Sequence, residues 1–443
     1  CLDCVVTFEG AEELEKELHS RGQWEFYQNV IKQAVPALTR MQSRGIAVDE
    51  ARRSEIDKEV EAELLGLRSK ISTLLGFDLN PHSPKQVSEL VYDKWHLPVQ
   101  TKSKQKSRTS DEDALKPLIR KSKDPTQIEI MKAINLARQK RVLLSTFVRM
   151  ELDNGRARTS YNLAGTVTGR LASSSTIEGF GGNLQNIPRG SFRKVFVADP
   201  GKVLIKADLS QAEYRVLIWR ARILRDITKF QDPSFSIHWW NASENIYKKP
   251  RAEITKQQYD EAKNGTYGAN YGIGPPKVSR MYDIELSQAK RIIDNYHTNV
   301  PEIKGVYQAE IRDLIQSTRC LTNPLGRSRL FFGRMDDELY RSAYSHYCQS
   351  TVADLIYLGL ITLDSGPDWL ELLLQVHDEL VCQVPDDPEH IREGCRLVKE
   401  AMEIPLKFEG VEQPLVIPVE IKVGRDWGSA KSVDDYLKEF HNG

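Results

Sequence analysis

Residues 202–215 read Lys-Val-Leu-Ile-Lys-Ala-Asp-Leu-Ser-Gln-Ala-Glu-Tyr-Arg, and this stretch decides the fold that we expect. Its apolar first part predicts a strand over Lys202–Ala207 that ends at Asp208. An acidic residue at the end of a strand is usually a solvent-facing turn residue. Asp208 therefore becomes informative only if the fold places a second acidic residue beside it.

A second strand with an acidic end lies far downstream. Leu372–Val376 and Leu380–Val384 are apolar strand candidates, and residues 377–379 between them (His-Asp-Glu) predict a hairpin with acidic residues at its turn. A further strand is expected over Leu415–Val423. Two strands of one sheet can bring their ends together however far apart they lie in sequence, so Asp208 and Asp378 can share one cleft.

A pair of converging carboxylates predicts a particular kind of metal site. Mg²⁺ binds few protein ligands and completes its shell with waters and substrate phosphates. Two such ions, about 3.5–4 Å apart, can activate an attacking oxygen and stabilise a leaving one. Asp208 and Asp378 therefore predict two Mg²⁺ ions as cofactor, with Mn²⁺ as the alternative.

The first half of the chain predicts helices. Apolar residues recur at three- and four-residue spacing from Glu12 to Gly76, with a break at Gly45. In the second half, helices are expected over Gln288–Tyr296 and Arg341–Leu358. A chain of 443 residues is long enough for two or more core-bearing units.

Composition limits the class of protein only loosely. Lys plus Arg equals Asp plus Glu, 62 against 62, so net charge gives no sign of a nucleic-acid partner. No run approaches the roughly 18 apolar residues of a membrane span, and no secretory leader opens the chain. Scattered cysteines fit a reducing compartment. We therefore expect an intracellular, cytoplasmic protein without a membrane partner, with an organelle as the alternative location.

The stretch from Thr101 to Thr109 is polar and basic. It contains Lys102, Lys104, Lys106 and Arg108. Such a run is usually a solvated loop. The alternative is a loop between two helices that follows a phosphate backbone.

A set of ordered motifs resembles the A family of DNA polymerases. Residues 208–215 resemble its first acidic motif, usually D-Y-S-Q-I-E-L-R, and residues 376–380 (Val-His-Asp-Glu-Leu) its hairpin motif. Residues 263–272 resemble its nucleotide-binding helix, K-x-x-x-[FY]-G-x-x-Y-G. Further matching segments are Thr168–Leu171, Asn183–Pro188, Ile237-His238, Gln349 with Ala353-Asp354, and Asn80–Val87. The resemblance extends from about Trp24 to Ala430.

The resemblance implies an α+β fold shaped like a right hand, with an antiparallel-sheet palm and helical thumb and fingers. The implied divisions are an N-terminal lead-in at 1–48, a thumb at 49–155, palm at 156–221, fingers at 222–334 and palm again at 335–443. A monomer is expected. The first 25 residues are too short for an exonuclease domain, so none is expected in this chain.

The same resemblance assigns the catalytic and metal-binding residues. Asp208 and Asp378 would hold both metals, the backbone carbonyl of Leu209 would add a ligand, and Glu379 would support the primer end. The implied reaction is attack by a primer 3′-hydroxyl on the α-phosphate of a dNTP, which depends on positioning and charge neutralisation.

The nucleotide-binding residues follow from the helix motif. On sequence alone, the glycines at 265, 268, 272 and 274 argue for turns, because each costs a helix about 1 kcal/mol. The resemblance instead implies a helix that carries the side chains for the triphosphate, the sugar and the templating position. The implied set is Lys263, Tyr267, Tyr271, Glu213, His238 and Gln211.

Two departures from the family pattern stand out. Tyr259 occupies the position where the family usually has an arginine, so a bidentate cation is missing. Lys256, seven residues before Lys263 on the same helical face, is expected to replace it together with His238. The second departure is an insertion at Thr176–Gly182.

Primer-template DNA and dNTPs are the implied partners; processivity and helicase partners are not indicated. The family reads the minor groove with residues that match Arg170, Gln185, Asn186, Gln349 and His377, and the 102–108 loop falls where its thumb tip follows the backbone. The alternatives are a single-subunit RNA polymerase and a catalytically idle DNA-binding subunit. Glu213 opposes the first, since a carboxylate beneath the sugar would clash with a ribose 2′-hydroxyl.

Overall fold

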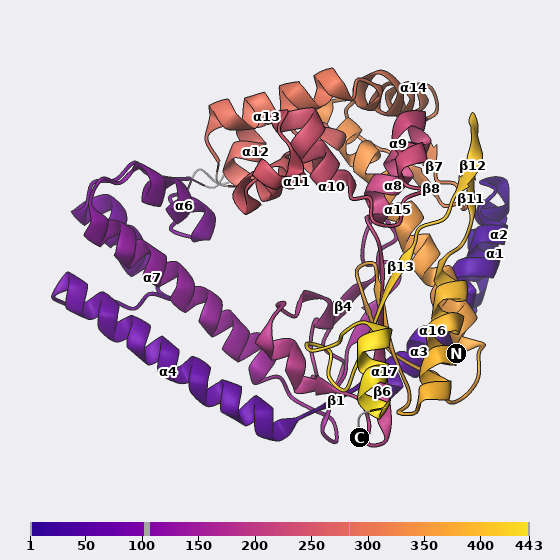
Figure 1. Cartoon of the computed structure of the whole chain (residues 1–443), viewed down its shortest axis with the longest axis horizontal. Helices are drawn as coiled ribbons and strands as arrows, with labels where there is room; N and C mark the ends of the chain where they lie inside the picture. Colours follow the sequence, from indigo (N-terminus) through magenta and orange to yellow (C-terminus); the bar gives the residue numbers. More distant parts are fainter. Residues whose placement is uncertain (1, 102–106, 283, 442–443) are drawn as a thin grey trace.

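The structure is a computed structural model that describes residues 2–101, 107–282 and 284–441. Its centre is a four-stranded antiparallel sheet in the order β13-β6-β10-β9. The strands are β6 (Lys202–Leu209), β9 (Glu371–Val376), β10 (Glu379–Pro385) and β13 (Val419–Gly424). Figure 1 shows helices beside this sheet. The expected α+β fold with a central antiparallel sheet is confirmed.

Both faces of the central sheet are covered, which explains why most residues of β6, β9 and β10 are buried. The long helix α15 (Asp337–Asp364) packs on β9 and β10, and α16 (Pro388–Met402) packs on β6 and β10. A second cluster of buried side chains covers Leu204, Leu374 and Val381. The sheet ends that carry the acidic residues are therefore set in a rigid core.

Two long helices form an arm that extends from the sheet (Figure 1). These helices, α4 (Glu50–Leu75) and α7 (Pro125–Val142), lie side by side. Asp49 and Asp124 cap their first turns through their side chains. A separate hydrophobic cluster fills the far part of the arm, around α5 (Pro84–Ser88) and α6 (Glu112–Lys121). The arm thus has a core of its own.

A group of helices lies across from the arm (Figure 1). It contains α8 (Ala212–Arg220), α9 (Leu224–Lys229), α10 (Ile237–Trp240), α11 (Lys256–Asn270), α12 (Pro275–Tyr282), α13 (Leu286–Asn299) and α14 (Ala309–Thr318). Helix α11 packs against α12 and α13. Its side chains belong to the same hydrophobic core as those of α8 and α15.

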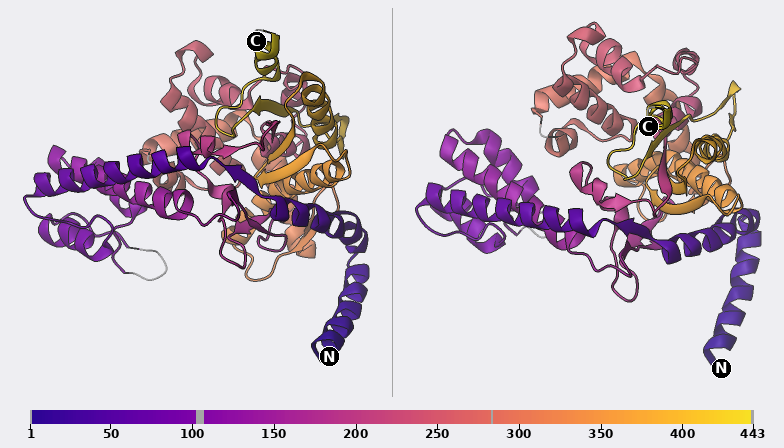
Figure 2. Two further views of the ribbon diagram at one scale, coloured as in Figure 1. Left: turned by 90° about the horizontal axis from the view of Figure 1, so that it is seen from below. Right: turned by 60° about the horizontal axis from the view of Figure 1, so that its bottom comes forward.

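Smaller elements complete the described fold. The short strands are β1 (Ile46–Val48), β2 (Arg156–Ala157), β3 (Ser160–Asn162), β4 (Ala172–Ser174), β5 (Phe196–Val197), β7 (Cys320–Thr322), β8 (Ser328–Leu330), β11 (Leu406–Phe408) and β12 (Val411–Leu415). The remaining α-helices are α1 (Leu2–Ser20), α2 (Trp24–Phe26), α3 (Lys32–Arg44) and α17 (Val433–His441). Figure 2 shows α1 projecting from the body. Among the described residues, the helices are all too short or too polar to span a membrane.

Several expected elements are confirmed and three need correction. The break at Gly45, the helices around Gln288–Tyr296 and Arg341–Leu358, and the hairpin are present. Strand β6 continues through Asp208 to Leu209, and Glu379 opens β10 outside the two-residue turn. The single strand expected over Leu415–Val423 is wrong. Two strands, β12 and β13, share that region because the chain leaves β12 at Leu415 and turns to join β6.

A buried ion pair holds the β7–β8 hairpin against α15. Asp354 is fully buried and accepts hydrogen bonds from Arg327 Nη2 at 2.6 Å and Asn323 Nδ2 at 2.6 Å. Gly169, at φ +80°, lies directly against the Arg327 guanidinium, and Tyr357 Oη donates to its carbonyl at 2.9 Å. The pair therefore also fixes the backbone just before Arg170.

We predict that Arg327→Met destabilises the fold by about 3–5 kcal/mol, because it leaves the Asp354 carboxylate buried without its cation. Urea unfolding measures this change. Arg396→Met is the matched control, since Arg396 pairs with Glu393 and Glu400 at the surface, where solvent screens the charges. Equal stability of the two variants would contradict the prediction.

Candidate active site

Asp208 lies near the end of β6, in a row of acidic residues that crosses three strands. It stands opposite Glu379 of β10 on one side and opposite Glu420 of β13 on the other. Paired residues of antiparallel strands point to the same face of a sheet. Three carboxylates therefore share one end and one face of the central sheet.

Asp378 reaches the same place from the turn between β9 and β10. The Leu209 N–H donates to the Asp378 carbonyl at 3.1 Å, which ties the turn to the end of β6. His377 takes a left-handed conformation, φ +60°, that a non-glycine residue adopts only when its surroundings hold it there. The Gln375 side chain supplies such a hold, because its Nε2 donates to the His377 carbonyl at 2.5 Å.

Glu379 is buried and both its carboxylate oxygens are occupied. Trp427 Nε1 donates to Oε1 at 2.7 Å, and Lys206 Nζ lies 3.0 Å from Oε2. These contacts fix the carboxylate beside Asp208. Sequence analysis missed Trp427, which stands outside the recognised motifs, and Lys206, which reads only as a polar strand position.

The electrostatics of the cluster are unfavourable for two negative charges. Burial raises the pKa of the Asp208 carboxyl to about 7, and the Asp378 and Glu379 carboxylates contribute to the rise. Burial also raises the pKa of Asp378, with Glu213 as a further cause. Bound cations would remove this penalty.

The donor set fits a hard divalent cation. Among the described residues, no group of three or more His, Cys, Asp or Glu side chains is arranged to hold a metal. Mg²⁺ does not need such a group, because it binds through one or two carboxylates and fills its shell with water and phosphate oxygens. Asp208 and Asp378, with the backbone at Leu209 beside them, supply oxygen ligands of the right kind.

Helix α11 carries the predicted nucleotide residues, and its glycines are packing residues. A Cβ at Gly265 would lie 2.5 Å from Ile292 Cγ2, and one at Gly268 would lie 2.9 Å from Val278 Cγ2. The glycines let α11 approach α13 and α12 closely. Lys263 and Tyr267 lie one turn apart on this helix, whereas Tyr271 is just beyond its last residue, Asn270.

Glu213 is held at both oxygens. Arg170 forms an ion pair with Oε1, and the Tyr271 hydroxyl donates to Oε2. Neighbouring Gln211 has φ +53°, and its Oε1 accepts from the Ile237 N–H at 2.9 Å, at the start of the helix that carries His238. These bonds join α8, α11 and α10 in a single group.

His238 is buried beside Lys263, and its expected role beside Lys256 stays a prediction. Burial, with the nearby Lys263 ammonium as a second cause, lowers the pKa of His238 to about 3. The imidazole is therefore neutral near pH 7. Its ring packs 5.5 Å from the Tyr267 ring, and its buried Nδ1 has no hydrogen-bond partner within the described residues.

Tyr259 takes part in a stack of rings and cations. The centroids of the Tyr259 and Trp239 rings lie 4.3 Å apart. The Arg251 guanidinium carbon lies 5.0 Å from the centroid of the Trp239 ring. Lys256 Nζ lies 4.7 Å from the Tyr259 ring and 2.8 Å from Asp260 Oδ1. Lys256 is thus at the start of α11, as expected, but already paired. Its contribution to phosphate binding stays a prediction.

A cavity of about 290 Å³ gathers three of the predicted DNA-binding residues. Arg170, Gln185 and His377 line it, together with parts of β4 and α15. The buried Gln185 Nε2 donates to Gln375 Oε1 at 2.7 Å, so this residue also supports the hairpin turn. Asn186 is exposed, and Gln349 lies half-buried on α15.

The basic stretch from Thr101 to Thr109 is described only in part. Lys102, Lys104 and Lys106 lie outside the described residues. Arg108 pairs with Asp93 through two hydrogen bonds, of 2.7 and 2.9 Å. The predicted contact with a DNA backbone is therefore not tested.

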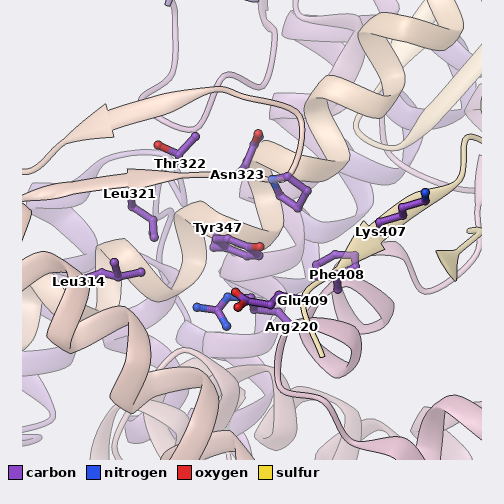
Figure 3. A pocket seen from close by; sticks show the side chains of 10 residues that line it. Arg220, Leu314, Leu321, Thr322, Asn323, Tyr347, Lys407, Phe408 and Glu409 are labelled. Carbon is purple, nitrogen blue, oxygen red and sulfur yellow. The ribbon is translucent and has the colours of Figure 1, made fainter. Parts of the chain in front are cut away.

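A separate cavity of about 240 Å³ lies between the end of α8, the β7–β8 hairpin and β11. Figure 3 shows the side chains of Arg220, Tyr347 and Glu409 converging in it. Arg220 is already paired with Glu310. The predicted site residues are absent from the lining of this cavity.

Comparisons with known proteins agree with the geometry. The family model for DNA polymerase family A matches residues 50–429. DNA polymerase I of Caldicellulosiruptor bescii is 30% identical over 428 residues, which cover 91% of this chain and 47% of that protein. The thermostable DNA polymerase I of Thermus filiformis is 30% identical over 427 residues, covering 91% and 48%. The chain thus spans about half the length of these curated relatives.

A solved structure shares the architecture. The POL domain of Pol1 from M. smegmatis, in a complex with DNA primer-template and dNTP, superposes with a TM-score of 0.82 at 26% sequence identity. The match covers 96% of this chain and 74% of that one. The expected polymerase fold is therefore confirmed. With the family model covering most of its length, this chain belongs to DNA polymerase family A.

Proposed function

We propose that this chain extends a DNA primer on a DNA template, adding dNTPs to the primer 3′ end with release of pyrophosphate. The observation that carries the proposal is that β6 and the β9–β10 turn place Asp208 and Asp378 together, although 170 positions separate them in sequence. The M. smegmatis structure, with its DNA and dNTP, supports this choice of substrates.

In the proposed mechanism, Asp208 and Asp378 hold the metal ions. Two bound Mg²⁺ ions would activate the 3′-hydroxyl and stabilise the leaving oxygen of pyrophosphate. Glu379, held in place by Trp427 and Lys206, lies beside them and adds a third carboxylate to the site. The rigid β9–β10 turn limits the reorganisation needed when substrate arrives.

Lys263 is the proposed contact to the triphosphate from α11. Neutral His238, beside it, can add a hydrogen bond but no positive charge. A second cation is therefore needed from elsewhere, and Lys256 remains the proposed source. It would have to exchange its Asp260 partner for phosphate.

Glu213 is the proposed basis for choosing deoxyribonucleotides. Because Arg170 and Tyr271 hold both oxygens, the carboxylate cannot easily move away from a ribose 2′-hydroxyl. This favours a DNA polymerase over a single-subunit RNA polymerase. The presence of Asp208, Asp378 and Lys263 argues against a catalytically idle DNA-binding subunit.

The remaining assignments follow the same proposal. We assign residues 49–155 to a thumb, 222–334 to fingers, and 156–221 with 335–443 to a palm. The cavity lined by Arg170, Gln185 and His377 would face the primer-template minor groove, whose acceptor pattern is nearly the same for all sequences. A monomer in the cytoplasm is proposed.

We predict that Asp208→Ala and Asp378→Ala each lower the single-turnover extension rate by more than about a thousandfold, because several kcal/mol of charge stabilisation is lost. Binding of primer-template, followed by fluorescence anisotropy, should change by no more than about twofold, since the contacts to phosphates are distributed. Glu371→Ala is the control, because Glu371 lies at the opposite end of β9. Extension within about tenfold of wild type by either aspartate variant would contradict the metal assignment.

For Glu213→Ala we expect the preference for dNTP over rNTP, measured as the ratio of kcat/KM values, to fall by roughly ten- to a hundredfold. Tyr271→Phe keeps the Glu213 carboxylate but removes one of the two groups that hold it. It should cause a smaller loss of the same ratio. An unchanged ratio in Glu213→Ala would contradict the role of Glu213 in excluding ribonucleotides and would favour the alternative of a single-subunit RNA polymerase.

Tyr267 yields a prediction about chain terminators. A dideoxynucleotide lacks the 3′-hydroxyl, and a phenolic hydroxyl against the sugar can replace that group as a hydrogen-bond donor. One neutral hydrogen bond is worth about 0.5–1.5 kcal/mol, or up to about tenfold. We expect Tyr267→Phe to lower kcat/KM for ddNTPs by this factor and to spare dNTPs. Equal ddNTP use by both proteins would show that Tyr267 is not against the sugar.

A further inference from the structure

Position 214 departs from the usual family motif, because it is a tyrosine where D-Y-S-Q-I-E-L-R has leucine. Tyr214 follows Glu213 in the first turn of α8. Its side chain is 1% exposed, so it is part of the interior. A leucine at this position would be equally apolar but would offer neither a ring edge nor a hydroxyl.

The Tyr214 ring is nearly perpendicular to the rings of two residues of the proposed nucleotide pocket. Its centroid lies 6.3 Å from that of Tyr267 at an interplanar angle of 86°, and 5.7 Å from that of His238 at 89°. His238 and Tyr267 in turn lie 5.5 Å apart. The three rings form a closed triangle, and edge-to-face pairs of this kind favour defined orientations.

The Tyr214 hydroxyl forms hydrogen bonds with two buried residues. It forms a hydrogen bond with the Tyr296 hydroxyl and accepts one from Asn241 Nδ2 at 2.7 Å. Tyr296 Oη donates to Asn270 Oδ1 at 2.7 Å. Burial raises the pKa of Tyr214, so the hydroxyl keeps its proton. The hydroxyl thus joins a buried hydrogen-bond network, whereas the ring alone makes the contacts with Tyr267 and His238.

Neighbouring residues make a second connection between the same helices. Glu213 accepts a hydrogen bond from Tyr271, while Tyr214 connects through Tyr296 to Asn270. Two consecutive residues at the start of α8 are thus linked to Asn270, the last residue of α11, and to Tyr271, which follows it. Because His238 Nδ1 has no partner within the described residues, packing against Tyr214 and Tyr267 is what orients its ring.

We propose that Tyr214 is a positioning residue of the nucleotide pocket, whose ring sets the orientations of Tyr267 and His238 and thereby the affinity for the incoming dNTP. The inference rests on the proposed polymerase function. It assigns to Tyr214 no contact with substrate. It predicts an effect on KM for dNTP more than on kcat.

The test compares Tyr214→Leu, which removes ring and hydroxyl, with Tyr214→Phe, which keeps the ring. Steady-state single-nucleotide incorporation should show KM for dNTP raised roughly tenfold in Tyr214→Leu, as expected from the loss of two ring contacts. KM in Tyr214→Phe should stay within about twofold of wild type, and so should kcat in both variants. Tyr436→Leu removes a buried tyrosine of α17 and controls for loss of stability. It should leave KM unchanged.

Three outcomes would overturn the proposal: an unchanged KM in Tyr214→Leu, an equal rise in Tyr214→Phe, or an equal rise in Tyr436→Leu. If Tyr214→Leu does not fold, Tyr214→Met provides the same test with an unbranched side chain. Absence of template-dependent extension by the wild-type protein is a different result. That result would contradict the proposed function itself. An active wild-type enzyme whose KM for dNTP is unchanged in Tyr214→Leu would contradict only the role of Tyr214.

Discussion

Repulsion between buried carboxylates is the constraint on which the rest of the site depends. Asp208, Asp378 and Glu379 share one end of the sheet, and burial there raises the pKa of Asp208 to about 7. A fold keeps such a cluster only if other contacts hold it. Lys206 and Trp427 hold Glu379, and Gln375 holds the turn that carries Asp378. The repulsion between these carboxylates lowers the stability of the fold, and a bound cation would relieve it.

The proposed nucleotide pocket is joined to this cluster through α8. Glu213 and Tyr214, only a few residues after Asp208, contact α11 from two directions. Through α11 they reach Tyr267 and Tyr271, and Gln211 ties the same segment to α10. One short stretch therefore carries both a carboxylate of the proposed metal site and the residues that contact the proposed nucleotide-binding side chains. This explains why residues 202–215 are so informative in the sequence.

Sequence analysis could predict whatever depends on local pattern or on a motif. The strand before Asp208, the hairpin around Asp378 and the break at Gly45 fall in this class. Residues 256–270 could not be predicted as a helix from propensity alone, because Gly265 and Gly268 are explained by Ile292 and Val278, which are distant in sequence. The hydrogen bond from Trp427 to Glu379 leaves no local signal, since it joins the segment after β13 to the start of β10 across 48 positions. The neutral state of His238 likewise depends on burial that only the fold creates.

The most direct test of this account is the unfolding midpoint of wild type and Asp208→Asn, each with and without saturating Mn²⁺. Without the cation, Asp208→Asn should be the more stable protein, because one of the repelling charges is gone. Adding Mn²⁺ should raise the wild-type midpoint through binding to the folded state and leave the variant nearly unchanged. An equal rise in both proteins, or a variant less stable than wild type without Mn²⁺, would contradict the claim that the carboxylates form a cation site.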